Sequence, residues 1–483
     1  MNKLQIIAKN IGILLLSQII TLILGFLYII YIARYLGTSG FGILSFALAF
    51  TGIFVILVDL GLNMLTVREV SRDKSLAGKY LGNTITLKII LALFTLSLIF
   101  LVVNIVKYPQ ETVNVVYLIG FSLIFGSFSG IFNSIFQAYE KMEYQSYGQI
   151  INSFLMFAGV LIAIYLGLDL YAFASIYFIV SIIVLIYSFV ICSWKFVLPK
   201  IEIDLNFWKL IILEALPFGL TSIFVLIYYY IDTVMISIII PNFNAIIGWY
   251  SAAYRIVMPL SFIPAIFFSS VFPVMANFYG TSEQSLNFAF EKSIKYMVIF
   301  GIPIATLITI LANKIILLIY GESYFPSVIA LQILIWTVPL IFIDSAFAYL
   351  FSSMNKQVTV AKIMAIVALF NILLNIILIP IYSYIGASFV TLASDLITLP
   401  LMMFVLSKTQ FKVPFKILKD VTKVFIASII MLIPLIILND LNIFIIILIS
   451  SLVYVATFLS LKGLDDEDIK IIKNIIPKKY KNH

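Results

Sequence analysis

Six ionisable residues that lie within long apolar segments, or at the end of one, could bind ions or charged ligands. Arg255 lies inside one segment and Arg34 at the outer end of another, and four segments carry an internal aspartate, at Asp59, Asp232, Asp344 and Asp395. Burying an unpaired charge in hydrocarbon costs several kcal/mol, so such residues usually mark ligand or ion pathways. We expect the aspartates to exchange a coupling cation, Na⁺ or H⁺, and the arginines to bind an anionic group.

Arginine is scarce among the basic residues, which makes its position informative. Only four of the 30 Lys and Arg residues are Arg, and Arg255 occupies an apolar context. The planar guanidinium binds phosphate or carboxylate through two parallel hydrogen bonds. The alternative is a structural ion pair between Arg255 and Asp232 on neighbouring segments. Both can hold, because a pair can open when an anionic ligand arrives.

Polar and aromatic residues add to these charges at helical spacing. Gln18, Asn133 and Gln137 belong to polar stripes, which in lipid must face protein or water. Tyr229 and Tyr254 offer aromatic faces with hydroxyls, which suit sugar rings. These residues predict a central hydrated cavity. The alternative is that the small residues in the stripes only allow helices to approach closely and that the tyrosines anchor the protein at the membrane interface.

Long apolar segments must position these side chains. The chain is 63% hydrophobic and 11% charged, with a mean hydropathy of +1.16, which excludes a soluble domain. One helical crossing takes roughly 20 apolar residues. The sequence therefore predicts an all-α integral membrane protein with about fourteen spanning segments, near 11–33, 42–64, 82–106, 114–138, 149–167, 170–193, 209–240, 246–276, 293–312, 328–351, 358–380, 385–406, 421–439 and 442–460.

Basic residues fix the expected orientation. Of the 30 Lys and Arg residues, 26 fall in every second gap between the apolar segments when the N-terminus is counted as inside, Lys88 among them. Cytoplasmic loops retain Lys and Arg, so we expect both termini in the cytoplasm of a multi-pass plasma-membrane protein. The first segment is too long for a signal peptide and lacks a cleavage site, so it should remain as a helix.

Several classes of chemistry are excluded. The single Cys192 allows no internal disulfide or cysteine metal site, and the only histidine is His483. No G-x-x-x-x-G-K-[ST] motif is present to bind a nucleotide. The net charge of +8 lines the inner membrane face, where anionic lipids attract it, so we expect membrane lipids and no nucleic acid as partners. We expect no cofactor, no metal and a monomer.

An internal repeat at an offset of about 206 residues suggests two halves. The sequence beginning at Gly42 shares G-x-x-S-x-A with the sequence beginning at Gly248, in the same topological position. We therefore expect two pseudo-symmetric six-helix lobes followed by two appended helices and a basic cytoplasmic tail, at 1–198, 199–408, 409–460 and 461–483. Most prolines within predicted helices fall in the second lobe, which should hold the bent, movable helices.

Six short motifs are distributed over most of the chain. They are Ala33-Arg-Tyr-Leu-Gly-Thr-Ser-Gly-Phe-Gly42, Asp59-Leu-Gly-Leu62, Arg68-Glu-Val-Ser-Arg72, Asp232-Thr-Val-Met235, Gly248-Trp-Tyr-Ser-Ala-Ala-Tyr-Arg255 and Asn371-x-x-x-Asn375. Together they resemble the Wzx-like oligosaccharide flippases, or polysaccharide biosynthesis membrane proteins, of the multidrug/oligosaccharidyl-lipid/polysaccharide exporter superfamily. The resemblance reaches about residue 406. It implies two six-helix lobes that open alternately to each membrane face and carry a lipid-linked oligosaccharide, a polyprenyl-phosphate or diphosphate glycan, to the outer leaflet.

Two other functions remain as alternatives. A multidrug or organic cation exporter of the same superfamily would share the fold, but it usually has twelve helices and an acidic cavity. A polysaccharide polymerase or glycosyltransferase would need catalytic residues in a sizeable outer loop, and the outer loops here carry only a few charged residues. We therefore expect a transporter and not an enzyme, coupled to an ion gradient.

Overall fold

The protein is built from helices throughout residues 3–412 and 416–475, which the computed structural model describes. The α-helices are α1 (Lys3–Asp59), α2 (Leu62–Arg72), α3 (Ala77–Val106), α4 (Gln110–Ala138), α5 (Met142–Tyr165), α6 (Leu170–Lys195), α7 (Leu205–Ile239), α8 (Asn244–Val257), α9 (Phe262–Thr281), α10 (Glu283–Ile319), α11 (Ser327–Leu334), α12 (Thr337–Ser353), α13 (Gln357–Ser407), α14 (Lys416–Ile437), α15 (Ile443–Ser460) and α16 (Asp466–Ile475). Short 3-10 helices are η1 (Lys74–Leu76), η2 (Met258–Ser261) and η3 (Glu322–Tyr324).

The number of membrane crossings agrees with the prediction. Within the described residues, 12 segments are long and apolar enough to span a bilayer. Gly12–Arg72 has 61 residues and Gln357–Ser407 has 51, and each contains a backbone break. Because one crossing needs roughly 20 residues, each of these two segments is long enough for two, which makes fourteen crossings. The predicted class, an all-α multi-pass membrane protein, is confirmed.

Three backbone breaks interrupt otherwise continuous helices. Gly37 (φ 66°) breaks α1 and Ser383 (φ 54°) breaks α13, while Leu60 (φ 45°) and Gly61 (φ 87°) separate α1 from α2. Glycine adopts positive φ at little cost, whereas Leu60 and Ser383 are strained there. Backbone groups freed inside a membrane must find partners. At the break between α1 and α2, the backbone N–H of Asn63 donates to the Asp59 carboxylate at 3.3 Å.

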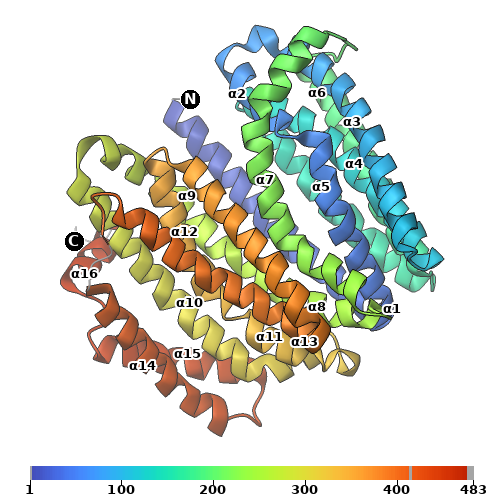
Figure 1. Cartoon of the computed structure of the whole chain (residues 1–483). Coiled ribbons are helices and arrows are strands. Elements are labelled where there is room, and N and C mark those ends of the chain that lie inside the picture. Colours follow the sequence, from blue (N-terminus) through green and yellow to red (C-terminus); the bar gives the residue numbers. More distant parts are fainter. Residues whose placement is uncertain (1–2, 413–415, 476–483) are drawn as a thin grey trace, which may run out of the picture. The chain divides into compact units, whose positions relative to one another are not determined.

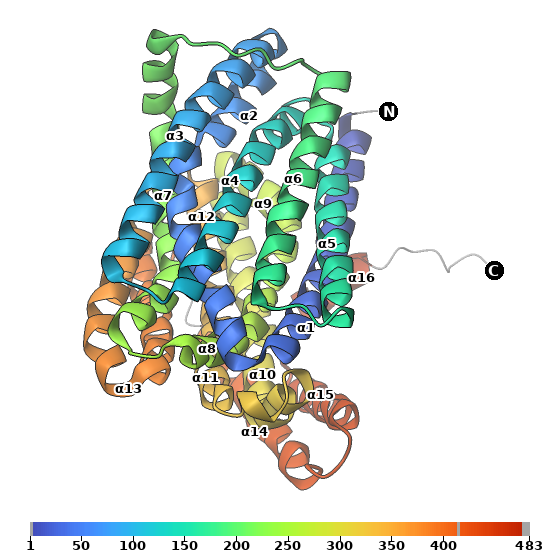
Figure 2. The ribbon, with the colours of Figure 1, turned by 90° about the vertical axis from the view of Figure 1, so that its right-hand side faces the viewer.

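The first of two compact units comprises residues 1–255, 319–330 and 364–390. Within it α4 packs against α6, and α1 packs against α4, α5 and α7; Figure 2 shows α3, α4, α5 and α6 side by side. Buried apolar side chains from α2, α3, α4 and α7 form its core, including Leu62, Leu81, Phe136 and Ile211.

The second compact unit comprises residues 256–318, 331–363 and 391–483. Here α9 packs against α12, and α14 and α15 form a helical hairpin. Figure 1 draws this hairpin in red beside α10, to which the Tyr454 hydroxyl donates a hydrogen bond at the Ile299 carbonyl, 2.8 Å away. The predicted lobe boundaries at 198 and 408 stay a prediction. Residues 476–483 of the predicted basic tail lie outside the described residues.

The repeated glycines meet in the first unit. A Cβ added at Gly42 would overlap the carbonyl oxygen of Asn244, and one added at Gly248 would overlap that of Thr38. Thr38 and Asn244 are themselves 206 residues apart, as are the two glycines. The two repeats therefore cross each other about a local two-fold axis, with backbone against backbone, which only glycine permits.

Candidate functional site

Arg255 lies in the last turn of α8, where a cation also complements the helix dipole. Its side chain is half-buried. The guanidinium lies within electrostatic range of Tyr28 on α1, Tyr177 on α6 and Tyr320 just after α10. Over the described residues, no carboxylate lies within ion-pair distance of it. In this part of the chain, Arg255 is therefore a cation with tyrosines in its electrostatic environment and no counter-ion.

The Tyr320 hydroxyl adds an unused donor at this position. Tyr320 is 2% exposed, and its hydroxyl has no hydrogen-bond partner among the described residues. A buried polar group without a partner costs about 1–3 kcal/mol, so the arrangement is unfavourable unless a ligand completes it. An anionic group placed here would accept hydrogen bonds from both Arg255 and Tyr320. We name Arg255, Tyr28, Tyr177 and Tyr320 the arginine site.

The Nε of Arg34 binds a backbone carbonyl within the protein. That atom donates to the carbonyl of Ile319, 2.7 Å away, at the C-terminal end of α10. The hydroxyl of Tyr324 donates to the Ala33 carbonyl at 2.9 Å. These two bonds hold the segment that carries Tyr320 against α1. Arg34 is exposed, and its predicted role in substrate binding stays a prediction.

Asp232 on α7 belongs to a buried oxygen-rich cluster and does not pair with Arg255. Its two carboxylate oxygens accept hydrogen bonds from the Tyr250 hydroxyl at 2.7 Å and from the Asn375 amide nitrogen at 2.6 Å. The same nitrogen donates to the Asn371 amide oxygen at 2.9 Å. Two neutral donors therefore bind the carboxylate, and the Asp232–Arg255 ion pair considered from the sequence is not among the ion pairs of the described residues.

The Asp232 cluster has the chemistry of a site for a small hard cation. Asn371 and Asn375 are fully buried, Asp232 is 3% exposed, and the amide oxygen of Asn375 has no hydrogen-bond partner among the described residues. Carboxylate and amide oxygens are the ligands that hard cations prefer. Tyr250 also stacks on Tyr254, with ring centroids 5.8 Å apart. Since Tyr254 precedes Arg255, α8 connects the cluster to the arginine site.

Asp59 is paired with a lysine that the sequence analysis placed in a cytoplasmic loop. Lys88 lies well inside α3 and is completely buried. Its ammonium bonds to Asp59 at 2.8 Å, to the Asn63 amide oxygen at 2.9 Å and to the Ser127 carbonyl at 3.0 Å. The loop assignment of Lys88 is wrong, because three oxygen partners at the α1–α2 break make its burial possible. Lys88 is therefore a second cation, besides Arg255, that lies within the apolar segments.

The remaining predicted site residues are dispersed. Asp344 on α12 and Asp395 on α13 interact electrostatically in the second unit. Gln137 donates to the Gln145 side chain at 2.9 Å, and Gln18 is exposed on α1. Asn133 and Tyr229 are half-buried. Among the contacts described here, only the electrostatic interaction of Asp344 with Asp395 joins two of these predicted residues.

Sequence reasoning missed Tyr320 and Lys88 as members of these sites. The spacing of Asn371 and Asn375, four residues apart on one helix face, was a usable signal for the Asp232 cluster. An ammonium seven residues inside an apolar run was a signal for Lys88. Within the described residues, no group of three or more His, Cys, Asp or Glu residues could hold a metal ion.

Comparison with known proteins agrees with this architecture. The helical bundle has the fold of MOP-superfamily transporters. It matches the structure of the lipid II flippase MurJ in an inward closed conformation with a TM-score of 0.70 and 19% identity, over 95% of this chain and 99% of that one. It matches an inward-facing multidrug resistance MATE family transporter with a TM-score of 0.66 and 15% identity, over 81% and 96% of the two chains.

Sequence profiles then give the family. The polysaccharide biosynthesis protein family matches residues 7–279, and the MatE family matches residues 217–377. The chain belongs to the polysaccharide biosynthesis protein family, as the motifs predicted. It is also 24% identical, over 370 residues, to an uncharacterised membrane protein of Methanocaldococcus jannaschii, with 73% of this chain and 71% of that protein covered.

Proposed function

We propose that the protein is an alternating-access flippase for a lipid-linked oligosaccharide. It moves a polyprenyl-phosphate or diphosphate glycan from the cytoplasmic to the outer leaflet of the plasma membrane, for the biosynthesis of cell-surface polysaccharide or glycoprotein. The observation that carries the proposal is the arginine site, which combines a half-buried guanidinium and, within its electrostatic range, a buried hydroxyl; among the described residues the first has no counter-ion and the second no hydrogen-bond partner. No covalent bond changes in this process, so the protein is not an enzyme.

The arginine site suits the phosphate of such a lipid. Arg255 supplies a planar fork for two phosphate oxygens, and Tyr320 supplies a hydroxyl donor to a third. The aromatic rings of Tyr28 and Tyr177, whose centroids lie 6.5 Å apart, provide faces on which sugar rings can lie. A charge-assisted hydrogen bond is worth about 1.5–3 kcal/mol, so the site can bind a phosphate and still release it.

An apolar groove in the second unit suits the lipid tail. It has a volume of about 590 Å³ and lies between α10 and the α14–α15 hairpin. Apart from Ser451 and the Tyr454 ring, its lining is aliphatic or phenylalanine, with Leu260, Ile299, Pro303, Leu307, Met431, Phe458 and Leu464 among the residues. Such a surface stabilises a hydrocarbon chain and offers nothing to a sugar.

The Asp232 cluster is our candidate for ion coupling. A Na⁺ ion held by the Asp232 carboxylate and the Asn371 and Asn375 amide oxygens would require Tyr250 to give up its present bond. A proton on Asp232 would have a similar effect, because a protonated carboxyl needs fewer donors. In either case the change reaches Tyr254 and Arg255 along α8, which provides a physical route from cation binding to phosphate binding.

Reconstitution tests the proposal directly. Proteoliposomes carrying a radiolabelled lipid-linked glycan should protect it from an impermeant reagent when the protein and an outward-directed Na⁺ or H⁺ gradient are present, because glycan that moves to the inner leaflet exchanges for a cation that leaves the vesicle. Arg255→Ala should reduce the initial rate about hundredfold, and Arg255→Lys should restore only part of it, because an ammonium lacks the planar fork. Lys141→Ala, which removes an exposed lysine on the α4–α5 connection, is the matched control. Equal rates for Arg255→Ala and wild type would contradict the assignment.

Orientation has its own test. With both termini cytoplasmic, a cysteine introduced at Lys74 on η1 should resist an impermeant thiol reagent in sealed cells and react after permeabilisation. Strong labelling from outside would reverse the proposed direction.

An exporter of organic cations is the second candidate, because the MatE family also matches part of the chain. An unpaired guanidinium in the site repels organic cations, so we favour the flippase. Export of a fluorescent cation that survives Arg255→Ala would support the exporter.

A further inference from the structure

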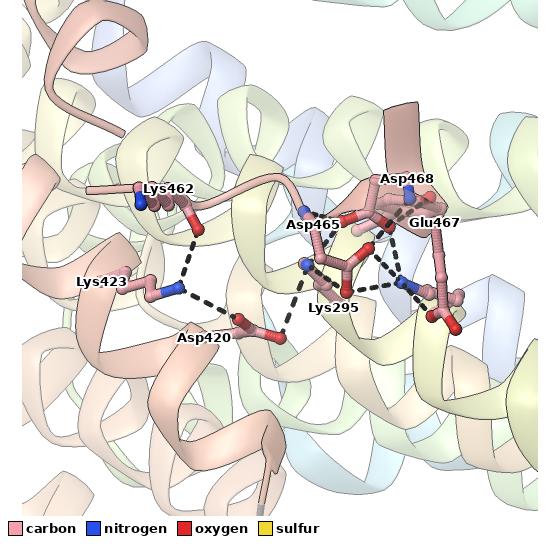
Figure 3. Close-up of polar contacts among 9 residues, drawn as sticks. Lys295, Asp420, Lys423, Lys462, Asp465, Glu467 and Asp468 are labelled. Carbon is pink, nitrogen blue, oxygen red and sulfur yellow. Dashed lines mark hydrogen bonds and ion pairs between the residues drawn. The ribbon is translucent and has the colours of Figure 1, made fainter. Parts of the chain in front are cut away.

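A cluster of acids and lysines ties the C-terminal helix α16 to α10, as Figure 3 shows. The Lys292 ammonium bonds to both oxygens of Asp465, at 2.8 and 2.9 Å, and to Asp468 at 2.8 Å. The Lys295 ammonium bonds to Asp468 at 2.5 Å and lies 3.6 Å from Asp420 on α14. Asp468 is completely buried, and the two lysines are 5% and 3% exposed. We name these five residues the clasp.

Two carboxylates of the clasp, those of Asp465 and Asp468, also cap the N-terminus of α16. The Asp465 side chain accepts from the Asp468 amide, and the Asp468 side chain accepts from the Asp465 amide, both at 2.9 Å. This reciprocal arrangement is a capping box. The first turn of α16 and its attachment to α10 therefore depend on the same two carboxylates.

The face of α10 that begins at the clasp continues into the apolar groove. Lys292, Lys295, Ile299, Pro303 and Leu307 follow one another at steps of three or four residues, so they share one side of the helix. The last three line the groove. From the C-terminal side, the groove is completed by Leu464, the residue immediately before Asp465. The clasp therefore forms one end of the groove.

The α14–α15 hairpin is held to α10 at the other end as well. Lys314, near the C-terminal end of α10, donates to the carbonyls of Asn439 and Leu441 in the turn between α14 and α15. Between these two ends, the Tyr454 hydroxyl donates to the Ile299 carbonyl. The groove therefore has a polar tie at each end, and a hydrocarbon chain that enters through an end requires the tie there to open.

Of the two ties, the clasp is the one whose contacts separate more easily. It is made of side-chain charges that water can solvate once they separate, whereas the outer tie uses backbone carbonyls. The connection between α15 and α16 is short and contains Lys462, with φ 51°, and Gly463, which packs against the Phe458 ring. A few residues with unusual backbone conformation are typical of a hinge.

We propose that the clasp is a releasable strap, whose opening admits the chain of a lipid into the groove between α10 and the α14–α15 hairpin from the α16 end. The identity of the lipid rests on the proposed function, whereas the strap itself does not. With the clasp closed, Leu464 covers the end of the groove. With it open, α16 swings on the 461–465 connection and the lysines are free to contact the phosphates of the bilayer surface.

The clasp does not open by protonation at ordinary pH. Burial raises the pKa of Asp465 and Asp468, but hydrogen bonds from Lys292 and Lys295 outweigh it and hold both pKa values below the usual range for aspartate. The other groups that face the carboxylates are Tyr296, Glu467 and Asp420. Opening is therefore driven by movement of α10 or by a competing anion.

Spin-label distances test the strap without any transport assay. In a Cys192→Ser background, labels at Gln284→Cys on α10 and Ile469→Cys on α16 should give a short and a long population in nanodiscs. Asp465→Asn with Asp468→Asn removes the charge but keeps residues that cap helices well, and should increase the long population at least threefold. Asp466→Asn, on the exposed first turn of the same helix, should leave it unchanged. One short distance in all three proteins would overturn the strap.

Cross-linking then tests its role. A short bis-methanethiosulfonate, which forms a reducible disulfide with each cysteine and releases methanesulfinate, should link Lys295→Cys to Asp468→Cys and reduce glycan transport at least tenfold, and reduction of the link should restore it. Full transport by the linked protein would overturn a strap that must open. If no lipid-linked glycan is transported at all while the distances behave as expected, the proposed function fails and the strap stands.

Discussion

Two buried cations show how differently this protein treats a charge inside the membrane. Lys88 is completely buried and has Asp59, Asn63 and Ser127 as partners, whereas Arg255 is half-buried and has no carboxylate near it among the described residues. The first arrangement is complete and stabilises a break between two helices. The second is incomplete and lies beside a hydroxyl that is also incomplete. The difference teaches that a ligand belongs where the protein leaves its own polar groups unmatched.

The largest effect should come from removing the counter-ion of Lys88. Asp59→Ala leaves a fully buried ammonium without a carboxylate, which should cost about 3–5 kcal/mol of stability. Thermal unfolding in detergent measures it. Adding Lys88→Met to Asp59→Ala should recover most of the loss, because the orphaned charge disappears. If the double variant is as unstable as the single one, Lys88 is not held by charge.

A transport defect of intermediate size should follow Tyr320→Phe. The change removes one hydrogen bond to the phosphate, so the initial rate should fall about tenfold, equivalent to about 1.4 kcal/mol. Unfolding should be unaffected or slightly more difficult, because the lost hydroxyl had no partner. Tyr324→Phe is the informative comparison, since its hydroxyl bonds to Ala33 and its loss should lower stability. A Tyr320→Phe variant that is less stable but transports normally would make the hydroxyl structural.

Arg255→Met should change stability by less than about 1 kcal/mol, or increase it, since no ion pair is broken. The same thermal measurement that detects Asp59→Ala applies. A loss comparable to that of Asp59→Ala would mean that Arg255 has a partner in the protein, and the contrast between the two cations would collapse.

The smallest effect concerns the pH dependence of stability. It involves the paired lysines of the clasp, Lys292 and Lys295. Because the folded-state pKa values of Asp465 and Asp468 are lowered, their contribution to stability is present above the ordinary aspartate value of about 3.9 and is lost as the pH falls below it. The difference in unfolding temperature between wild type and Asp465→Asn with Asp468→Asn should therefore be constant from about pH 8 to 5. A difference that disappears near pH 6 would contradict the lowered pKa values.

Much of the fold could be predicted because lipid constrains a chain so strongly. The spanning segments followed from hydropathy, and even the two crossings that run together at Gly37 and Ser383 were separated correctly. Positive charge near a segment end is ambiguous, however, because a lysine there can reach water or pair inside. Lys88 was misplaced for that reason, and its partners on α1 and α4 could not be read from its neighbours.

The site was predicted less completely than the fold. Residue type and apolar context identified Arg255 and Asp232 as important, but not their relationship. Asp232 bonds to Asn375, which is 143 residues away, and the clasp joins residues 173 and 176 apart. Pairing at such separations depends on how helices pack, and no local pattern records it. The two-fold contact of Gly42 and Gly248 was accessible only because a repeat duplicated it.

The order in which the clasp residues are synthesised has a consequence for biogenesis. Lys292 precedes its partner Asp465 by 173 residues, so at about 5–20 residues per second the ribosome needs roughly 10–35 s to supply it. During that interval α10 is in the membrane with two lysines unmatched, and they must reach the headgroups or be shielded by an insertase. A segment made much later therefore completes a helix inserted long before it, and chains that stall before Asp465 should be recognised by membrane quality control at α10.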